Sequence, residues 1–255
     1  MKRWSALILT LLVACAPAPT GRAPVSASPA PALPFQADFS DAGVTWVAGG
    51  KAYVARAPNL RPLLSPLPTP AVAAAWVGNV AWGALPGPGI IVTLDGPPET
   101  RVVGRVIRLS RQRLYLQDGS VLTYTGTPAG SVPGTPDMVL TGGDGEDYAL
   151  VGGELYRPGQ PPTRLTPARL PAGSGFLYRL PGRGAAVAER PSVQTDQGLY
   201  QLSGRALERL GSGGEVIASL PHGPGLIGEV GGRLVTLSAE GQLRVFTPDL
   251  REVRP

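Results

Sequence analysis

Short apolar runs alternate with glycine and proline turns along most of the chain after Phe35. Runs such as Val106–Leu109 and Leu234–Leu237 are bounded by turns, which is typical of β-strands. The Asp118-Gly119 pair lies between alternating apolar residues and is a strong hairpin signal. No stretch after Ala14 sustains a helical period. The pattern therefore predicts an all-β fold.

One unit, a turn followed by a short apolar or aromatic strand, recurs along the chain. Its copies are Gly49–Tyr53, Gly78–Trp82, Arg111–Tyr115, Gly152–Arg157, Asp196–Tyr200 and Gly231–Val235. A repeat of roughly 36 residues indicates a repeat array or a propeller. Within one copy, Leu155 and Tyr156 are adjacent, so they point to opposite faces of their strand. A propeller blade packs both faces against neighbouring blades, whereas a sandwich strand exposes one face. The six copies therefore predict a β-propeller of six short blades.

Closure of such a ring needs a contact between its first and last blades. An open ring would leave unpaired backbone groups at two sheet edges. We expect a strand at Phe35–Phe39 to pair with the last blade near Arg244–Thr247. The segment Gly231–Leu237 followed by Gly241–Phe246 resembles the repeat of quinoprotein-like and NHL-type propellers, and Gly198–Leu202 is similar. The resemblance implies the fold alone, because propellers host unrelated functions.

The N-terminus has the pattern of a secretory signal. Lys2 and Arg3 precede an apolar run, Trp4–Ala14, which is too short to span a bilayer as a helix. The run ends in Leu12-Val13-Ala14-Cys15, which resembles the lipobox of bacterial lipoprotein signal peptides. That resemblance implies cleavage before Cys15, diacylglycerol on its sulfur, and acylation, for example with palmitate, of the new amino terminus. Ordinary signal cleavage remains an alternative, because Ala14-Cys15-Ala16 also fits a small-x-small site.

These features predict three regions: a signal peptide over residues 1–14, a lipid-anchored Pro-rich tether over 15–34, and the propeller domain over 35–255. The tether holds six prolines between Ala16 and Pro34, which favours extended conformers and cannot build a core. The predicted location is the bacterial cell envelope, with the domain facing the periplasm or the exterior. Cys15 is the one cysteine of the chain, so an intrachain disulfide is excluded.

Composition supports a packed domain and offers little chemistry. The chain is 43% hydrophobic and 16% charged, and its net charge of +5 is too small to indicate nucleic-acid binding. The single histidine, His222, is expected on a surface loop. Asp144–Asp147 could offer oxygens to Ca²⁺, but it lacks the alternation of a calcium loop, so a solvated turn is expected. No nucleophile elbow, phosphate loop or zinc motif is present, so no catalytic, cofactor or metal residue is predicted.

Three further groups of residues have two interpretations each. Trp46, Trp76 and Trp82 are expected to pack between blades and not to form a ligand platform. A run of arginines could hold lipid headgroups or an acidic partner. We favour the other interpretation, in which the charges lie on an outer strand and deter edge-to-edge pairing. The run comprises Arg101, Arg105, Arg108, Arg111 and Arg113. Three longer irregular segments are expected to present a recognition surface; these are Gly126–Pro136, Pro158–Pro162 and Pro167–Gly175.

The function predicted from these features is a lipid-anchored envelope propeller that acts as a non-catalytic binding or scaffolding module with an envelope protein as partner. An alternative is a periplasmic lactonase-like hydrolase with a metal in the central channel. A quinone-dependent dehydrogenase is a weaker alternative, since no cofactor-binding pattern is visible. Acidic side chains that converge at one mouth of the channel would favour the hydrolase.

Overall fold

The computed structural model describes residues 36–141, 146–165, 168–169, 176–179, 185–187, 191–238 and 240–254. Two compact units divide the chain, at residues 1–32 and 33–255, and every described residue belongs to the second. The signal sequence, Cys15 and the tether therefore lie outside the described residues. Within those residues every regular element is a strand, and no helix has the length and apolarity to cross a membrane.

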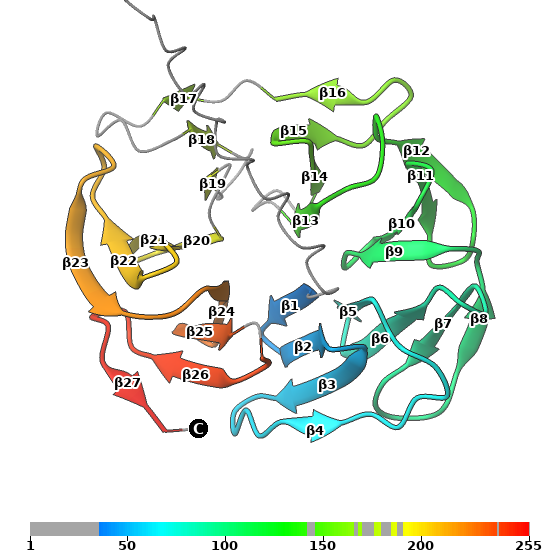
Figure 1. Ribbon diagram of the computed structural model, residues 1–255, viewed down its shortest axis with the longest axis horizontal. Helices are drawn as coiled ribbons and strands as arrows, with labels where there is room; N and C mark the ends of the chain where they lie inside the picture. The colour runs from blue at the N-terminus through cyan, green and yellow to red at the C-terminus, as the bar shows by residue number, and fades with distance from the viewer. Residues whose placement is uncertain are drawn as a thin grey trace, which may run out of the picture. The chain divides into compact units, whose positions relative to one another are not determined.

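Six four-stranded antiparallel sheets, called blades 1 to 6 below, stand in a ring (Figure 1). Blade 1 is β1 (Gln36–Ser40), β2 (Gly43–Ala48), β3 (Lys51–Arg56) and β4 (Leu63–Leu64). Blade 2 is β5 (Ala73–Val77), β6 (Val80–Leu85), β7 (Ile90–Thr93) and β8 (Thr100–Val102). Blade 3 is β9 (Val106–Leu109), β10 (Arg113–Leu116), β11 (Ser120–Thr123) and β12 (Pro128–Ser131).

The second half of the ring follows the same plan. Blade 4 is β13 (Met138–Thr141), β14 (Asp147–Val151), β15 (Glu154–Arg157) and β16 (Thr163–Arg164). Blade 5 is β20 (Ser192–Thr195), β21 (Gly198–Leu202), β22 (Ala206–Leu210) and β23 (Val216–Pro221). Blade 6 is β24 (Gly225–Val230), β25 (Arg233–Ser238), β26 (Leu243–Phe246) and β27 (Glu252–Val253). In each blade the first strand lies nearest the centre and the last lies at the rim (Figure 1).

A seventh sheet of three short strands lies between blades 4 and 5, both in the chain and in the ring (Figure 1). Its strands are β17 (Ala168–Arg169), β18 (Phe176–Arg179) and β19 (Ala185–Val187). The predicted six-bladed propeller is confirmed as six four-stranded blades. The strands at Phe176–Arg179 and Ala185–Val187 belong to this separate sheet and to none of the six blades.

Glycine pairs make the tightest hairpins of the ring. The pairs at 49–50, 152–153 and 231–232 join β2 to β3, β14 to β15 and β24 to β25, and all six glycines have positive φ. Two-residue turns with positive φ at both positions match the twist of antiparallel strands, and glycine adopts them without steric cost. The Gly-Gly repeats visible in the sequence are therefore hairpin turns.

The hydrophobic core lies between neighbouring blades, as the two-sided apolar strands predicted. Every residue of β2 is buried, so both faces of this strand are packed. Separate apolar clusters fill the spaces between blades 1 and 2, 2 and 3, 3 and 4, 5 and 6, and 6 and 1. Trp46, Trp76 and Trp82 are buried within three of these clusters, which confirms that they are core residues.

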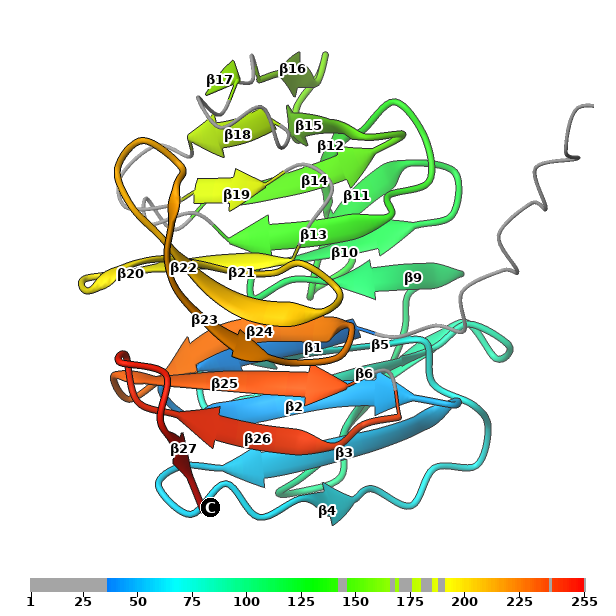
Figure 2. The same cartoon turned by 60° about the vertical axis from the view of Figure 1, so that its left-hand side comes forward.

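Ring closure differs from the sequence-based expectation. β1 does not pair with the last blade; it pairs antiparallel with β2, with Phe39 opposite Val44, and forms the innermost strand of blade 1. Closure comes from packing of β1 against β24, and Figure 2 shows these two strands side by side. Gly228 makes this contact possible, because it has no side chain and the Phe39 ring fills the space where one would stand.

Candidate functional site

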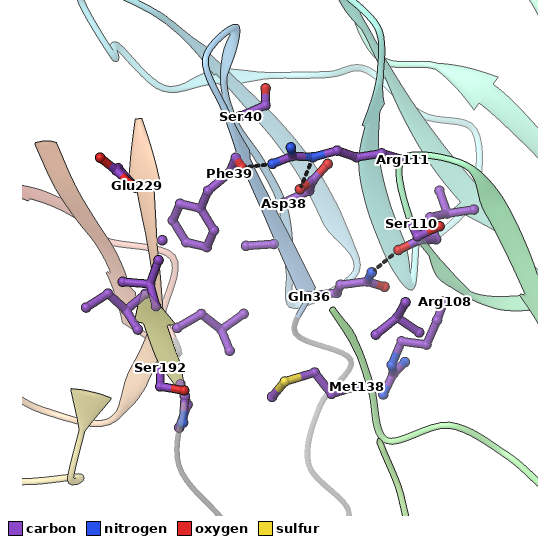
Figure 3. A pocket seen from close by; sticks show the side chains of 18 of the residues that line it. Gln36, Asp38, Phe39, Ser40, Arg108, Ser110, Arg111, Met138, Ser192 and Glu229 are labelled. Atoms are coloured by element: carbon purple, nitrogen blue, oxygen red, sulfur yellow. Dashed lines mark hydrogen bonds and ion pairs between the residues drawn. The ribbon is translucent and has the colours of Figure 1, made fainter. Parts of the chain in front are cut away.

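The inner strands of the ring surround a cavity of about 360 Å³. Residues of β1, β9, β13, β20 and β24 line it, so it is the central channel of the propeller. Figure 3 shows its lining side chains on two sides of the cavity. Gln36, Asp38, Arg108 and Arg111 lie on one side, and Phe39 points toward β24 on the other. Its volume falls in the range of small-molecule sites, but half of its lining residues are polar or charged.

Asp38 and Arg111 form an ion pair that links three blades. Arg111 Nε lies 3.2 Å from Asp38 Oδ1, and Trp76 N–H of β5 donates to Asp38 Oδ2 at 2.8 Å. Arg111 also donates to the carbonyl of Phe39. Burial raises the pKa of Asp38, and the positive charge of Arg111 opposes that rise. The inner edge of a sheet carries unpaired backbone groups, and this ion pair satisfies two of them.

Two further side chains cap inner-edge carbonyls across the channel. Gln36 Nε2 of blade 1 donates to the Leu109 carbonyl of blade 3 at 2.6 Å. Arg108 Nε of blade 3 donates to the Asp137 carbonyl, next to β13 of blade 4, at 3.1 Å. Blades 1 to 4 are therefore connected through polar side chains at the channel, while their apolar clusters hold them together farther out.

Behind the channel wall, Asp147 of β14 is fully buried and accepts two hydrogen bonds. Ser110 Oγ donates to its Oδ2, and Tyr115 OH donates to the same atom at 3.2 Å. The Ser110 hydroxyl also accepts the N–H groups of Gln112 and Arg113, at 3.2 and 2.9 Å. This hydroxyl–carboxylate pair thus holds the β9–β10 turn against blade 4, which is a structural role.

Two acidic residues of the cavity lining, Glu229 of β24 and Asp41, lie close enough for their charges to interact. Burial raises the pKa of the Glu229 carboxyl, and the negative charge of Asp41 adds to the rise. Within the part of the chain that the structure describes, no group of three His, Cys, Asp or Glu side chains could hold a metal ion. The described cavity lining therefore carries four carboxylates, those of Asp38, Asp41, Asp137 and Glu229, and Asp38 is paired with Arg111.

The predicted arginine run does not lie on one outer strand, so that interpretation was wrong. Arg101 is on the rim strand β8 and lies over the ring of Trp82, and Arg113 pairs with Glu146 at 3.2 Å. Arg108 and Arg111 line the channel. Arg101 and Arg108 are only seven residues apart but separate in this way, because β9 runs along the channel and β8 along the rim (Figure 1).

Two other sequence-based expectations were also wrong. His222 is not a surface residue, since only 6% of it is exposed. Its Nε2 lies 2.8 Å from Thr236 Oγ1, and its ring meets Phe246 edge-on. In the acidic segment Asp144–Asp147, Asp144 and Gly145 lie outside the described residues, but Asp147 is buried and bonded and is not part of a solvated turn.

The predicted recognition loops are only partly loops. Gly126–Pro136 contains the rim strand β12, which pairs with β11 of blade 3. Pro158–Pro162 lies against it, because Ser131 N–H donates to the Gly159 carbonyl at 3.0 Å. Most of Pro167–Gly175 lies outside the described residues. The first segment is therefore part of a blade and is a poor candidate for a free recognition loop.

The channel residues were missed by sequence reasoning, although a signal exists for β1. Gln36, Asp38 and Ser40 alternate with Ala37 and Phe39, which gives one polar and one apolar face. Such alternation at the start of a blade marks an inner strand with a polar face toward the channel. No comparable signal distinguishes Arg108 from its neighbouring arginines.

No protein-family model matches the chain, and no curated protein matches it. Among solved structures, PorZ, an essential surface component of the type-IX secretion system of Porphyromonas gingivalis, is 16% identical with a TM-score of 0.49. The match covers 86% of this chain and 37% of that chain, so this chain spans little more than a third of PorZ.

Two proteins that are shorter than PorZ also match. A catalytically inactive virginiamycin B lyase from Staphylococcus aureus with quinupristin is 14% identical, with a TM-score of 0.47 and coverage of 85% of this chain and 81% of that chain. BamB from Moraxella catarrhalis is 15% identical, with a TM-score of 0.42 and coverage of 81% and 84%. Similarity at this level concerns the fold and carries no argument about function.

Proposed function

We propose that this protein is a lipid-anchored propeller of the bacterial cell envelope that binds or scaffolds a protein partner without catalysing a reaction. The non-catalytic assignment rests on the hydrogen bonds and the ion pair that polar side chains of the channel make between blades. Asp38, Arg111 and Gln36 bond the inner edges of different blades to one another. Groups committed in this way stabilise a rigid ring, which suits a binding module.

The anchor rests on the sequence. Leu12–Cys15 has the lipobox pattern, and the apolar run before it is too short to span a bilayer. One lipid chain holds a protein only marginally at a membrane, whereas the two or three chains of a bacterial lipoprotein hold it firmly. The Pro-rich residues 16–34 would then separate the domain from the membrane surface by up to about 60 Å when fully extended.

Replacing the thiol tests the anchor directly. Cys15→Ser should abolish lipidation and shift the protein from the membrane fraction to the soluble fraction, or leave the signal uncleaved. Mass spectrometry of the mature amino terminus of the native protein should show acylated Cys15. An unmodified terminus at Ala16 or beyond would refute the anchor.

The binding role needs a separate experiment in intact cells. Crosslinking followed by purification of the native lipoprotein should recover a defined envelope partner, and Cys15→Ser should reduce that recovery. Recovery of the same partner at the same level from the soluble variant would show that binding does not need the anchor. A hydrolase activity of the purified protein that a chelator abolishes would overturn the non-catalytic assignment.

A further inference from the structure

The outer strand of blade 5, β23, is the longest outer strand among the six blades as the structure describes them. It spans Val216–Pro221, whereas the outer strands β4, β8, β12, β16 and β27 have four residues or fewer. β23 is the last strand of its sheet, so it pairs only with β22, and it lies at the rim of the ring (Figure 1). Its other side is an open sheet edge, to which a further strand can add.

The other outer strands carry features that protect a sheet edge. Short length, charged side chains and proline all deter pairing with another chain. β4, β16 and β27 have two residues each, β8 contains Arg101, and β12 begins at Pro128 and is bridged to the next blade through Ser131 and Gly159. β23 contains no charged residue, and its one proline, Pro221, is its last residue. Blade 5 therefore has the one long, unprotected outer edge among the described blades.

The register of β23 determines which of its backbone groups point outward. The pairing with β22 is regular over residues 218–221 and continues to His222, whose N–H donates to the Arg205 carbonyl at 3.0 Å. Bonded and unbonded positions alternate along an antiparallel strand, so the N–H and carbonyl of Ser219 point away from β22. Ser219 is also exposed. An added strand would therefore find one donor and one acceptor on the same residue.

Apolar side chains flank the open edge on both faces of the sheet. Ala218 and Leu220 pack on the cluster between blades 5 and 6. Val216 and Ile217 are 53% and 54% exposed. These two neighbours are both exposed because the register with β22 skips Ile217, and such a bulge breaks the alternation of side chains. Two exposed β-branched side chains thus adjoin the unpaired edge.

We propose that the open edge of β23 binds the same edge of a second copy of this chain, in antiparallel orientation. With Ser219 opposite Ser219 of the second copy, the two residues exchange N–H to carbonyl hydrogen bonds across a two-fold axis. This register places Ala218 opposite Leu220 and Ile217 opposite Pro221. Apolar side chains then meet apolar ones, and no like charges face each other. The two copies of blade 5 form one continuous sheet.

A second copy fits this edge because the strand is complementary to itself. A two-fold contact requires that each copy offer both the donor and the acceptor that the other needs, and Ser219 on the axis does so. The strand has no charge that would select an oppositely charged peptide. A single strand pair makes an interface at the small end of the range for specific complexes, so the dimer should exchange with monomer. This contact is independent of the lipid anchor and of the envelope partner proposed above.

Sedimentation equilibrium of the purified full-length protein measures the dimer, in a non-ionic detergent whose density is matched by the solvent. The native protein should show a monomer–dimer equilibrium that depends on protein concentration. Ser219→Pro removes the outward N–H from both copies and should raise the dissociation constant at least about tenfold. Ser219→Lys places two like charges opposite each other on the axis and should also weaken the dimer, and added salt should reduce this effect.

Val102→Lys is the matched control for both variants. Val102 is 85% exposed on the outer strand β8, so its replacement adds the same charge and removes more apolar surface than Ser219→Lys does. The monomer–dimer equilibrium of this variant should match that of the native protein. Because Ser219 is exposed, Ser219→Lys should fold even if Ser219→Pro does not, and melting temperatures check the fold of each variant.

Photocrosslinking in intact cells identifies the occupant of the edge. A photoreactive amino acid in place of Ser219 should give a product that contains two copies of this chain and no other protein, and the same amino acid in place of Val102 should not. Three results would overturn the proposal. The first is a native protein that stays monomeric up to millimolar concentration. The second is that folded Ser219→Lys and Ser219→Pro proteins dimerise as the native protein does, or that Val102→Lys weakens the dimer equally. The third is a crosslink from position 219 to a different protein without any product that holds two copies.

Discussion

Gly228 is the position at which a single methyl group should test how the ring closes. A Cβ at Gly228 of β24 would lie 2.1 Å from Phe39 Cγ and 2.4 Å from Phe39 Cβ. Carbon atoms in contact prefer about 3.5–4.0 Å. Phe39 Cβ belongs to the base of the side chain, so rotation about χ1 alone does not clear the overlap. Gly228→Ala must therefore displace the Phe39 ring or separate β1 from β24.

The cost follows from the way the ring closes. Blade 1 and blade 6 share no strand, because each is built from four consecutive strands of its own. Packing of β1 on β24 thus joins the two ends of the domain, together with the apolar cluster between blades 6 and 1. Overpacking of this kind costs about 1–3 kcal/mol. For a domain of this size that corresponds to a fall in melting temperature of roughly 2–12 °C.

Thermal and urea unfolding followed by circular dichroism would measure this cost. Gly87→Ala is the control, because a Cβ there meets nothing within 4 Å and alanine at such a site is neutral or slightly stabilising. The double variant Phe39→Ala/Gly228→Ala should be more stable than the sum of the single changes predicts, by about 1–2 kcal/mol, since the clash disappears with the ring. A Gly228→Ala protein that melts with the native protein, or additive single changes, would refute closure through this contact.

Two further predictions concern carboxyl groups. Asp147→Ala should destabilise the domain by about 1–3 kcal/mol in urea unfolding, because it removes the carboxylate that accepts from the Tyr115 hydroxyl and leaves Ser110 only the weaker bond to the Arg113 carbonyl; a change below about 0.5 kcal/mol would contradict this. Burial, and secondly the charge of Asp41, raise the pKa of Glu229, so the folded state binds this proton more tightly than the unfolded state. The folded protein therefore gains stability as pH falls through the folded-state pKa of Glu229, and it loses this stability as pH rises. Glu229→Gln should melt higher than the native protein at neutral pH and show a smaller rise on acidification toward about pH 5; parallel pH profiles would contradict the assignment.

The hairpins and the fold class were readable from the sequence because both depend on neighbours in the chain. A Gly-Gly pair such as 152–153 turns the backbone through positive φ wherever it stands. Likewise, adjacent apolar residues such as Leu155 and Tyr156 require partners on both faces of a strand. These local facts predicted an all-β ring with cores between blades.

The assignment of each hairpin to a place in its blade was not readable. The glycine pair at 49–50 forms the second hairpin of blade 1, whereas the pair at 231–232 forms the first hairpin of blade 6. The uneven spacing of the repeats arises from this difference, together with the three-stranded sheet between blades 4 and 5. A turn has the same local geometry in either place, so only packing against the neighbouring blades decides which one it takes.

The channel was decided by the tertiary structure. The alternation of Gln36 and Asp38 with apolar residues indicated a strand with one polar face, but their partners, Leu109 and Trp76, lie 73 and 38 residues farther along the chain. Local sequence also placed five arginines in one run and could not separate Arg108 from the rest. Curvature of the ring brings β1, β5, β9 and β13 together at the centre, and the distances between their polar groups exist only once the blades have packed.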